Sequence, residues 1–492
     1  MVEMISNINR TINNFVWGMP CLTLLILTGV VMTVLTKCFQ VTHIGHWMST
    51  TIGAVFKKSS GVNDKSDQHA ISQFQSLCTA LAATIGVGNI AGVATAITSG
   101  GPGAIFWMWV AAFFGMMTNY SENVLGIYYR RKNTEGEWCG GAMYYLRDGL
   151  GSYKGCKQLG KVLAVLFSIF CIMASFGIGN ASQINTISTN MNNVFHIPTW
   201  VTGIALMLIA GLVIVGGIKR IASVTEKIVP FMAIAYIIGT LIVFFVNIDQ
   251  AGAVFKSIFS FAFGFKAIGG AAIGIAVKNA VTWGFKRGVF SNEAGLGSSV
   301  MVHSASNVKE PVQQGMWGIF EVFADTMVVC TLTAFVVLSS GFVNLETGVL
   351  AEGAGEASAL VSQAFSTVFG SAGGVFIAIA ILFFAFSTVL GWSYYGTKAW
   401  EFLFGTKSTI VYKIVFVLFI VVGAAMSLDL AWDISDTFNG LMSIPNLIGV
   451  LSLSPIVMKI TKNYIARNLK GEKVEPMLSV FPDVQEEQEK EL

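Results

Sequence analysis

The sequence predicts an all-α membrane protein in which two sets of helices cross the bilayer in opposite orientations. The first observation is composition: the 492 residues are 54% hydrophobic and only 12% charged, whereas soluble proteins carry roughly 25% charged residues. The second is that apolar stretches of about 20 residues, long enough to cross a bilayer, recur along the whole chain. The third is a pair of glycine-interrupted stretches at corresponding positions of the two sets.

Eleven spans fit the hydropathy when the apolar stretches are taken in order. We place them near residues 16–36, 71–98, 103–129, 161–190, 200–217, 228–247, 268–303, 313–340, 371–401, 412–428 and 437–458. The chain then divides into an N-terminal helix with its loop (1–65), a first five-helix repeat (66–250), a second, inverted repeat (251–465) and a tail (466–492). Because the tail is charged and contains proline, we expect it to be disordered.

The distribution of positive charge predicts how the spans are oriented. Most of the 30 Lys and Arg residues lie in loops and span ends on one side, whereas the stretch 341–370 on the other side has none. Loops rich in Lys and Arg stay in the cytoplasm. We therefore expect a cytoplasmic C-terminus and, after an odd number of spans, an N-terminus outside the cell.

The stretch Ala80–Gly92 interrupts the second span. Gly86 and Gly88 lack the side chains with which a membrane helix packs, and Thr84 and Asn89 add polar groups. A break inside hydrocarbon leaves backbone groups unpaired at several kcal/mol each, so it persists only where it lines an enclosed cavity. Freed carbonyls bind a cation there, and the N-terminus of a half-helix binds a carboxylate. The alternative is close helix packing through a small-xxx-small pair that begins at Gly88.

A second interrupted span, Ala267–His303, is the sixth helix counted from the first interrupted one. Five helices per set is an odd number, so the second set enters the membrane upside down, and such paired breaks mark the central site of a transporter. Phe290 predicts an apolar wall that excludes large side chains. Ser291 and Asn292 are candidates for orienting the substrate.

Acidic residues at membrane depth are rare, because a charge there costs on the order of 3 kcal/mol. Glu293 lies in the second break, where such a rare acid indicates a functional site. The alternative is that Glu293 forms a structural ion pair with Lys286 or Arg287. Glu321 and Asp325 are four residues apart and share a helix face. These two acids either line a cation path or form hydrogen bonds within the bundle. We favour the second, structural interpretation.

Polar and aromatic residues of two other spans complete the predicted site. The Gln183 amide both donates and accepts, which suits a zwitterion, although an interhelical hydrogen bond explains it equally well. Ser387 and Thr388 offer hydroxyls for a cation site together with carbonyls near Ala83. Trp392 lies one turn from Thr388, where it offers a wall for a small side chain; the alternative is a core or interfacial aromatic residue.

Other functional classes lack their signatures. The sequence contains no Walker loop, no nucleophile paired with a base and no metal-ligand cluster such as His-Glu-x-x-His. We therefore expect neither ATP as the driving force nor an enzyme. A channel typically repeats a pore motif by subunit symmetry, whereas this chain has an inverted repeat. The seven cysteines include no Cys-x-x-Cys pair, so we interpret them as buried apolar residues.

Several long runs resemble those of one transporter family. The run 100–115, Gly-Gly-Pro-Gly-Ala-Ile-Phe-Trp-Met-Trp-Val-Ala-Ala-Phe-Phe-Gly, resembles the signature of the alanine or glycine:cation symporter family. The run 82–94 looks like the first broken helix of that family, and the runs 288–297 and 386–396 look like its other hallmark segments. The resemblance covers about Asn13 to Lys459.

The resemblance implies a LeuT-like fold of five plus five helices with one extra N-terminal helix, 11 transmembrane helices in all. It also implies Na⁺- or H⁺-coupled uptake of alanine or glycine. By motif, the implied substrate-binding residues are Thr84, Ile85, Gly86, Val87, Gly88, Gln183, Phe290, Thr388 and Trp392. By analogy with the fold, the implied cation-binding residues are Ala83, Gly86, Ser387 and Thr388.

The resulting hypothesis is a symporter that imports alanine, glycine or both with Na⁺ across a prokaryotic plasma membrane. The alternative is proton coupling through Glu293, Glu321 or Asp325; an amino-acid-gated channel is less consistent with the sequence. We expect a small neutral amino acid, Na⁺ or H⁺ and the lipid bilayer as partners, no nucleic acid, and no cofactor besides the co-transported ion. The sequence does not distinguish alanine from glycine or serine, L from D substrates, or one oligomeric state from another.

Overall fold

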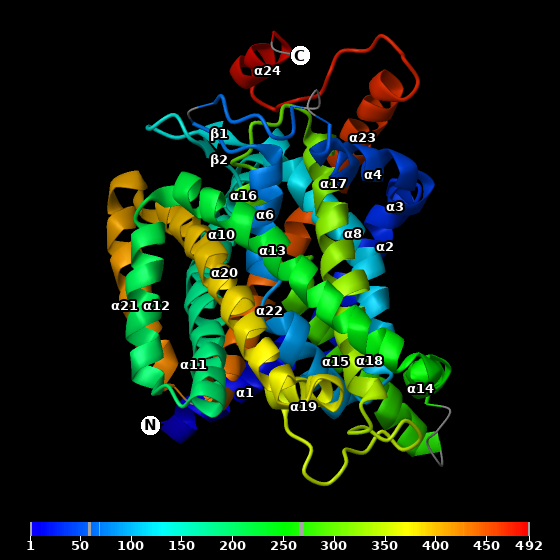
Figure 1. Cartoon of the computed structure of the whole chain (residues 1–492). Helices are drawn as coiled ribbons and strands as arrows, with labels where there is room; N and C mark the ends of the chain where they lie inside the picture. The colour runs from blue at the N-terminus through cyan, green and yellow to red at the C-terminus, as the bar shows by residue number, and fades with distance from the viewer. Residues whose placement is uncertain (1, 58–60, 68, 265–269, 427, 491–492) are drawn as a thin grey trace.

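The computed structural model describes residues 2–57, 61–67, 69–264, 270–426 and 428–490. In these parts of the chain the regular structure is helical, apart from one antiparallel hairpin of β1 (Arg131–Lys132) and β2 (Trp138–Cys139). Figure 1 shows the long helices gathered in one bundle, with the two termini at opposite ends. We call the end that carries β1, β2 and the C-terminus the C-terminal face, and the opposite end the N-terminal face.

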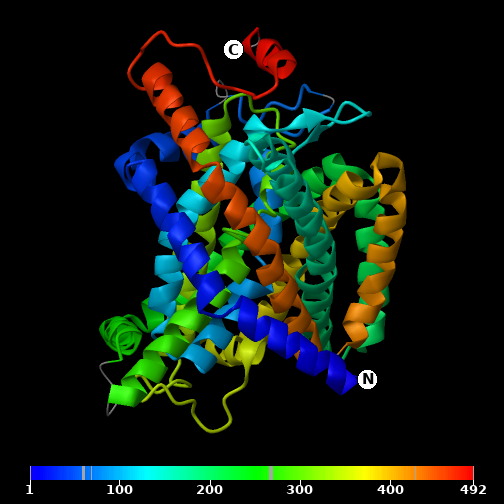
Figure 2. The same cartoon turned by 180° about the vertical axis from the view of Figure 1, so that it is seen from behind.

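The chain begins with a helix on the N-terminal face that the sequence analysis did not predict. This helix, α1 (Val2–Val16), lies across that face, and α2 (Met19–Leu35) then runs toward the C-terminal face (Figure 2). The contacts of α1 and of the residue after it are specific: Asn13 Nδ2 donates to Thr437 Oγ1 at 3.1 Å, and the Trp17 indole N–H donates to the Asp436 carbonyl at 2.8 Å. Three short helices follow α2: α3 (Phe39–Thr42), α4 (Ile44–Thr50) and α5 (Ile52–Val55).

The helices of the predicted first repeat follow in chain order. They are α6 (Gln73–Thr84), the π-helical turn η2 (Gly88–Gly92), α7 (Val93–Gly100), α8 (Ala104–Tyr128), α9 (Ala142–Tyr144), η3 (Tyr145–Gly149), η4 (Leu150–Ser152), α10 (Lys157–Phe176), the π-helical turn η5 (Gly177–Ala181), α11 (Ser182–Phe195), α12 (Thr199–Ile214), α13 (Gly217–Val246) and η6 (Ile248–Gln250).

The helices of the predicted second repeat include two that lie near the N-terminal face, α14 and α19 (Figure 1). The order is α14 (Ala251–Ala262), α15 (Gly270–Asn292), α16 (Val300–His303), α17 (Pro311–Val322), the π-helical stretch η7 (Phe323–Cys330), α18 (Thr331–Ser339), α19 (Ala357–Phe369), α20 (Ser371–Phe404), η8 (Thr406–Ser408), α21 (Thr409–Ala425), α22 (Leu428–Ser452) and α23 (Ser454–Asn468). The start of the second interrupted span, residues 267–269, lies outside the described residues.

Both predicted interruptions occur as breaks between helices. The Ser72 side chain accepts from the Gln75 N–H, and Gln75 bonds back to Ser72, so α6 begins with a capping box. The axis of α6 and the axis of Gly88–Gly100 then differ by 51°. In the second interruption, α15 ends because Glu293, Gly295 and Gly297 have φ of 57°, 93° and 71°. This left-handed region breaks a right-handed helix and favours glycine.

The described residues contain six helices that are long and apolar enough to cross a membrane, or up to eight if each bent pair forms one span. The bent pairs are α6 with the segment Gly88–Gly100, and Trp432–Ser452 with α23. The predicted eleven spans also include stretches outside these helices, such as 103–129 and 200–217, so the number of eleven spans and the extra N-terminal span stay predictions.

The C-terminal tail differs from the disordered segment that we expected at 466–492. It contains the end of α23 and a further helix, α24 (Pro482–Glu489), which lies beside the β1–β2 hairpin on the C-terminal face (Figure 1). Lys132 Nζ and Glu487 Oε1 are 2.7 Å apart, and the Arg131 guanidinium lies 4.0 Å from the centre of the Phe481 ring. These contacts hold the tail against the hairpin, and the composition of the tail gave no indication of them.

Candidate substrate and cation site

The first break is supported by an asparagine that bonds the backbone where α6 ends. The Ile85 N–H still donates to the Leu81 carbonyl at 2.8 Å, but Ile85 has a ψ of 88°, which takes the chain out of the helix. The Gly86 N–H then donates to Asn89 Oδ1 at 2.9 Å. The Asn89 side chain thus replaces a lost helical acceptor, which lowers the cost of breaking a helix in apolar surroundings.

Two glycines let the first break contact helices from both repeats. A side-chain carbon at Gly86 would meet Thr388 Oγ1 of α20 and would lie 3.2 Å from Gln183 Oε1 of α11. A side-chain carbon at Gly88 would lie 3.3 Å from Cδ1 of Phe290 on α15. The structure therefore brings predicted residues from four separate parts of the chain into one place.

Gln183 follows the π-helical turn η5, which connects α10 to α11. Its Oε1 accepts from the Val87 N–H at 3.2 Å, and its Nε2 donates to the Ile178 carbonyl at 2.9 Å. The first of these is the interhelical hydrogen bond that we weighed as the alternative. The same amide lies against Gly86, where it is able to exchange a bond to the protein for a bond to a ligand carboxylate or ammonium.

Ser387 and Thr388 bring two hydroxyls to a carbonyl of α6. Each has the Ala82 carbonyl within hydrogen-bond distance, at 3.2 and 3.0 Å. Each also has the Phe384 carbonyl of α20 in reach, at 2.9 and 3.0 Å, and shares its single proton between the two acceptors. The carbonyl that the hydroxyls reach is thus one residue before the predicted Ala83. Oxygen atoms converging from a broken helix and its neighbour form the kind of ligand set that binds Na⁺ in transporters of this architecture.

The second break is joined to α20 through Glu293. The Trp392 indole N–H donates to Glu293 Oε1 at 2.7 Å, and Ser298 Oγ donates to Glu293 Oε2 at 2.5 Å. The alternative that Glu293 forms an ion pair with Lys286 or Arg287 is wrong, because both of those cations pair with an acid on α22.

That acid is Asp436, and it connects α15 to α22 on the side of the site nearer the N-terminal face. Lys286 Nζ lies 2.7 Å from Asp436 Oδ2, and Arg287 Nη1 lies 3.1 Å from Asp436 Oδ1. The Phe290 and Trp432 rings stack with their centres 4.9 Å apart. The predicted apolar wall at Phe290 is therefore shared with Trp432, which the sequence analysis did not identify.

Asp325 lies at the centre of a second group of oxygen atoms. Asn89 Nδ2 donates to Asp325 Oδ1 at 2.6 Å, and Ser291 Oγ and Thr326 Oγ1 donate to Asp325 Oδ2, both at 2.8 Å. Asn292 Nδ2 donates to Thr326 Oγ1 at 3.0 Å. Ser291 and Asn292, predicted to orient the substrate, thus bond to η7. A buried carboxylate that connects both breaks is a second candidate cation site.

Glu321 belongs to a different set of contacts from Asp325, although the two were predicted to share a face. Glu321 Oε2 lies 3.0 Å from His303 Nε2, and Asn119 Nδ2 donates to the same oxygen at 3.4 Å. His303 Nδ1 in turn bonds Gln314 Nε2 at 2.5 Å. Both acids are thus hydrogen-bonded within the bundle, and a role of either acid in a cation path stays a prediction.

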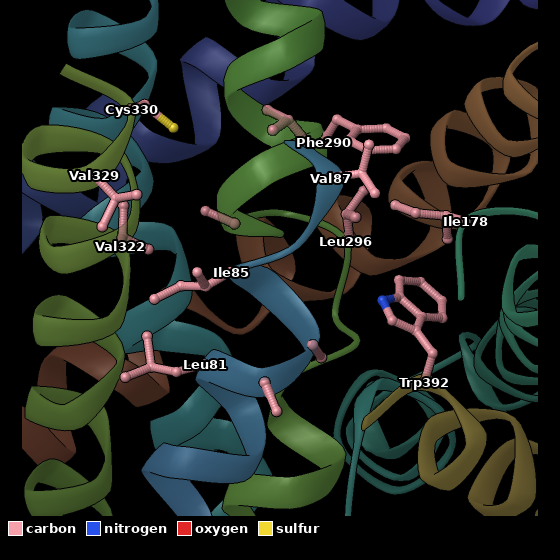
Figure 3. Close-up of a cluster of buried hydrophobic side chains, with 14 of the residues drawn as sticks. Leu81, Ile85, Val87, Ile178, Phe290, Leu296, Val322, Val329, Cys330 and Trp392 are labelled. Atoms are coloured by element: carbon pink, nitrogen blue, oxygen red, sulfur yellow. The ribbon is translucent and has the colours of Figure 1, made fainter. Parts of the chain in front are cut away.

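Apolar side chains surround the two breaks. Figure 3 shows Val87 and Phe290 next to one another, with Trp392 opposite Ile178. The Trp392 ring packs on the backbone of η5, because a side-chain carbon at Gly179 would lie 2.7 Å from Trp392 Cγ. Thr84 is buried, and its Oγ1 donates at 3.2 Å to the Ala80 carbonyl of its own helix. Large apolar groups thus enclose the two breaks, as is typical of the walls of a small-ligand site.

Two discontinuous helices that face each other in the middle of a membrane bundle define a class of proteins, the secondary transporters. Comparison with known proteins is more specific. A model of the sodium:alanine symporter family matches residues 2–477, and the chain belongs to this family.

Relatives of known name extend over nearly the whole chain. The sodium/alanine symporter AgcS of Methanococcus maripaludis is 45% identical over 95% of this chain and 99% of its own. The putative sodium/proton-dependent alanine carrier protein YrbD of Bacillus subtilis is 34% identical over 94% of this chain and 93% of its own. The probable sodium/glutamine symporter GlnT of Bacillus subtilis is 36% identical over 96% and 93%.

Solved structures show the same fold at low sequence identity. The crystal structure of MhsT in complex with L-phenylalanine matches with a TM-score of 0.54 and 12% identity, covering 80% of this chain and 99% of that one. The outward-open state of a Na⁺-coupled sialic acid symporter matches with a TM-score of 0.52 and 12% identity, covering 97% and 95%. The chain is a multi-pass plasma-membrane transporter and not an enzyme.

Proposed function

We propose that the protein imports alanine, and glycine as a second substrate, together with Na⁺. The observation that carries this proposal is the contact between the two breaks. Gly86 lies against Gln183 and Thr388, and Gly88 lies against Phe290. A small amino acid fits here because backbone and amide groups face its charged ends, while Phe290 and Trp392 limit the size of its side chain.

The Na⁺ would bind between α6 and α20, at the Ala82 carbonyl and the hydroxyls of Ser387 and Thr388. Both hydroxyls now donate to that carbonyl, and each has lone pairs that turn toward a cation when one enters. A cation at this place would hold the broken helix against α20 and so stabilise the form that binds substrate. This gives the coupling a physical basis, because an ion shifts an equilibrium only by its differential affinity for the two states.

Transport would follow when one repeat rocks against the other around the bound substrate. We propose that the C-terminal face is cytoplasmic, because the basic loops lie there. One Na⁺ that moves through about 100 mV supplies roughly 2.3 kcal/mol. At about 1.4 kcal/mol per factor of ten, this supports roughly 50-fold accumulation before any Na⁺ gradient is counted.

Uptake of labelled L-alanine into proteoliposomes tests this function. An inward Na⁺ gradient is compared with an equal K⁺ gradient at constant pH, and glycine and serine compete in parallel. Concentrative uptake with Na⁺ alone supports the proposal. Equal uptake in both gradients rejects Na⁺ coupling, and absence of uptake from verified, inserted protein rejects the substrate.

Proton coupling is the second candidate, and one observation favours it. Three buried acids, Glu293, Glu321 and Asp325, lie within or beside the two breaks, and each is hydrogen-bonded by neutral groups. A relative is also named as sodium/proton-dependent. Alanine uptake driven by a pH gradient in Na⁺-free buffer distinguishes this candidate from the first.

A further inference from the structure

A buried lysine on α20 connects this helix to the β1–β2 hairpin near the C-terminal face. Lys398 is only 4% exposed. Its Nζ lies 2.8 Å from Glu401 Oε2 on the same helix and 3.3 Å from Glu137 Oε2, next to β2. Asn133 Nδ2, also in the hairpin, donates to Glu401 Oε1 at 2.9 Å. Together these bonds attach the hairpin to the end of α20.

A small cavity adjoins this ion-pair cluster. It has about 80 Å³ of free space, and its charged lining residues are Glu135, Glu137, Glu401, Lys398 and Lys413. Tyr394 also lines the cavity, and its buried hydroxyl has no hydrogen-bond partner among the described residues. Buried polar groups nearly always have partners, so this hydroxyl is available to a ligand that enters the cavity.

One face of α20 leads from the candidate Na⁺ site to this cavity. Ser387, Gly391, Tyr394 and Lys398 follow one another at spacings of four, three and four residues, so they lie on the same face. That face packs closely on α6, because a side-chain carbon at Gly391 would lie 2.7 Å from Cβ of Ala83. At 1.5 Å per residue, Lys398 lies about 16 Å along the helix from Ser387.

We propose that Lys398 is the inner gate for the co-transported cation, closing the route from the α6–α20 site to the C-terminal face. Its ammonium lies between two carboxylates that would otherwise attract a passing cation. When the hairpin and α20 separate, Lys398 loses Glu137 but keeps Glu401 of its own helix, and the route past the Tyr394 hydroxyl opens to Na⁺ on its way out. This inference rests on the proposed Na⁺ coupling and adds to it the point at which the cation's route is closed.

A purely structural role for Lys398 makes a different prediction. Buried ion pairs add little stability by themselves, although loss of one partner is costly. A structural lysine therefore affects expression and thermal stability, whereas a gate controls how fast Na⁺ leaks when no substrate is bound. Lys132 supplies a matched control, because it lies in the same hairpin and pairs with exposed Glu487 on α24.

The first test measures efflux of radioactive Na⁺ from proteoliposomes without alanine. We expect Lys398→Met to raise the leak about tenfold or more over wild type, because local fixed charge changes ion concentration and entry by such factors. We expect Lys132→Met to leave it unchanged. A Lys398→Met protein that binds alanine in a Na⁺-dependent way and leaks no faster than wild type overturns the gate. If wild type shows no Na⁺-dependent alanine binding, the proposed function itself has failed.

The second test uses the wild-type protein, so it does not depend on folding of a variant. Cys139 Sγ lies 3.3 Å from Lys398 Nζ, and burial raises the pKa of this thiol to about 11, which makes it unreactive while the gate is closed. Its alkylation by a maleimide is quantified by mass spectrometry. We expect faster labelling in K⁺ than in Na⁺, because Na⁺ holds α6 against α20, with no change at buried Cys171. Equal Cys139 labelling in the two salts overturns the proposal.

Discussion

The Trp392 indole N–H donates to Glu293 Oε1 at 2.7 Å, which joins α20 to the break that follows α15. Glu293 has the left-handed φ of 57°, which a non-glycine residue rarely adopts. The hydrogen bonds from Trp392 and Ser298 hold the carboxylate while the backbone turns. A movement of α20 therefore acts directly on the second break, and a substrate bound at the proposed site would contact the same connection through Trp392.

Two replacements of Trp392 separate its ring from its N–H. We expect Trp392→Phe to keep an apolar wall but leave Glu293 Oε1 without its donor, at a cost of about 1–3 kcal/mol in stability. We expect Trp392→Ala to lose the wall as well and to weaken alanine binding more strongly. Na⁺-dependent alanine binding and thermal unfolding of both purified variants provide the comparison. Wild-type affinity in Trp392→Ala, in a folded protein, excludes this residue from the substrate site.

Replacement of Gly86 tests the closest approach in the site. In Gly86→Ala, the added methyl meets Thr388 Oγ1 and lies 3.2 Å from Gln183 Oε1. We expect alanine binding to fall by a factor of ten or more, because overpacking costs about 1–3 kcal/mol. Gly252→Ala is the control, since nothing lies within 4 Å of its added carbon. Equal loss of binding in both variants contradicts the assignment.

The sequence predicted the elements that hold the site better than the contacts within it. Gly86 and Gly88 revealed the first break, because polar neighbours in the middle of an apolar span favour a break over the close helix packing that glycine alone allows. The partner of Lys286 and Arg287 was not predicted. Asp436 follows them by about 150 residues on another helix, and sequence spacing carries no information about such a distant pair. Asp436 lies just before the predicted span 437–458, and an acid so close to membrane depth is the kind of signal that indicates a buried partner.

The tail and the hairpin show a related limit of sequence analysis. Residues 466–492 have the composition of a disordered segment, yet α24 packs beside β1 and β2. The contact depends on a few specific neighbours, such as Lys132 with Glu487 and Arg131 with Phe481. Composition describes a whole segment, so it does not reveal which individual residues make such contacts. Long membrane spans are easier to predict, because their apolar character continues over many residues and does not depend on one particular neighbour.

The hydroxyls of α20 are expected to determine the Na⁺ dependence of alanine binding. Both Ser387 and Thr388 donate to the Ala82 carbonyl. We expect Thr388→Val to raise the Na⁺ concentration needed for half-maximal alanine binding by about tenfold, equivalent to roughly 1.4 kcal/mol, and Ser387→Ala to act in the same direction. Ser393→Ala is a suitable control, because Ser393 Oγ bonds the Leu390 carbonyl of its own helix. Unchanged Na⁺ dependence in both site variants places the cation elsewhere.

Asp325 distinguishes a second Na⁺ from a proton. Its carboxylate accepts bonds from Asn89, Ser291 and Thr326, which between them belong to the first break, the second break and η7. Asparagine at this position keeps the shape but removes the negative charge that a second cation requires. If Asp325 binds Na⁺, the Asp325→Asn protein keeps Na⁺-dependent alanine binding, but the Hill coefficient for Na⁺ falls toward one. If Asp325 carries a proton instead, Na⁺ cooperativity is unaffected and the variant loses uptake driven by a pH gradient. Serial Na⁺ titrations of alanine binding at two pH values, with wild type and Asp325→Asn in parallel, give the first readout, and uptake into proteoliposomes from the same preparation gives the second.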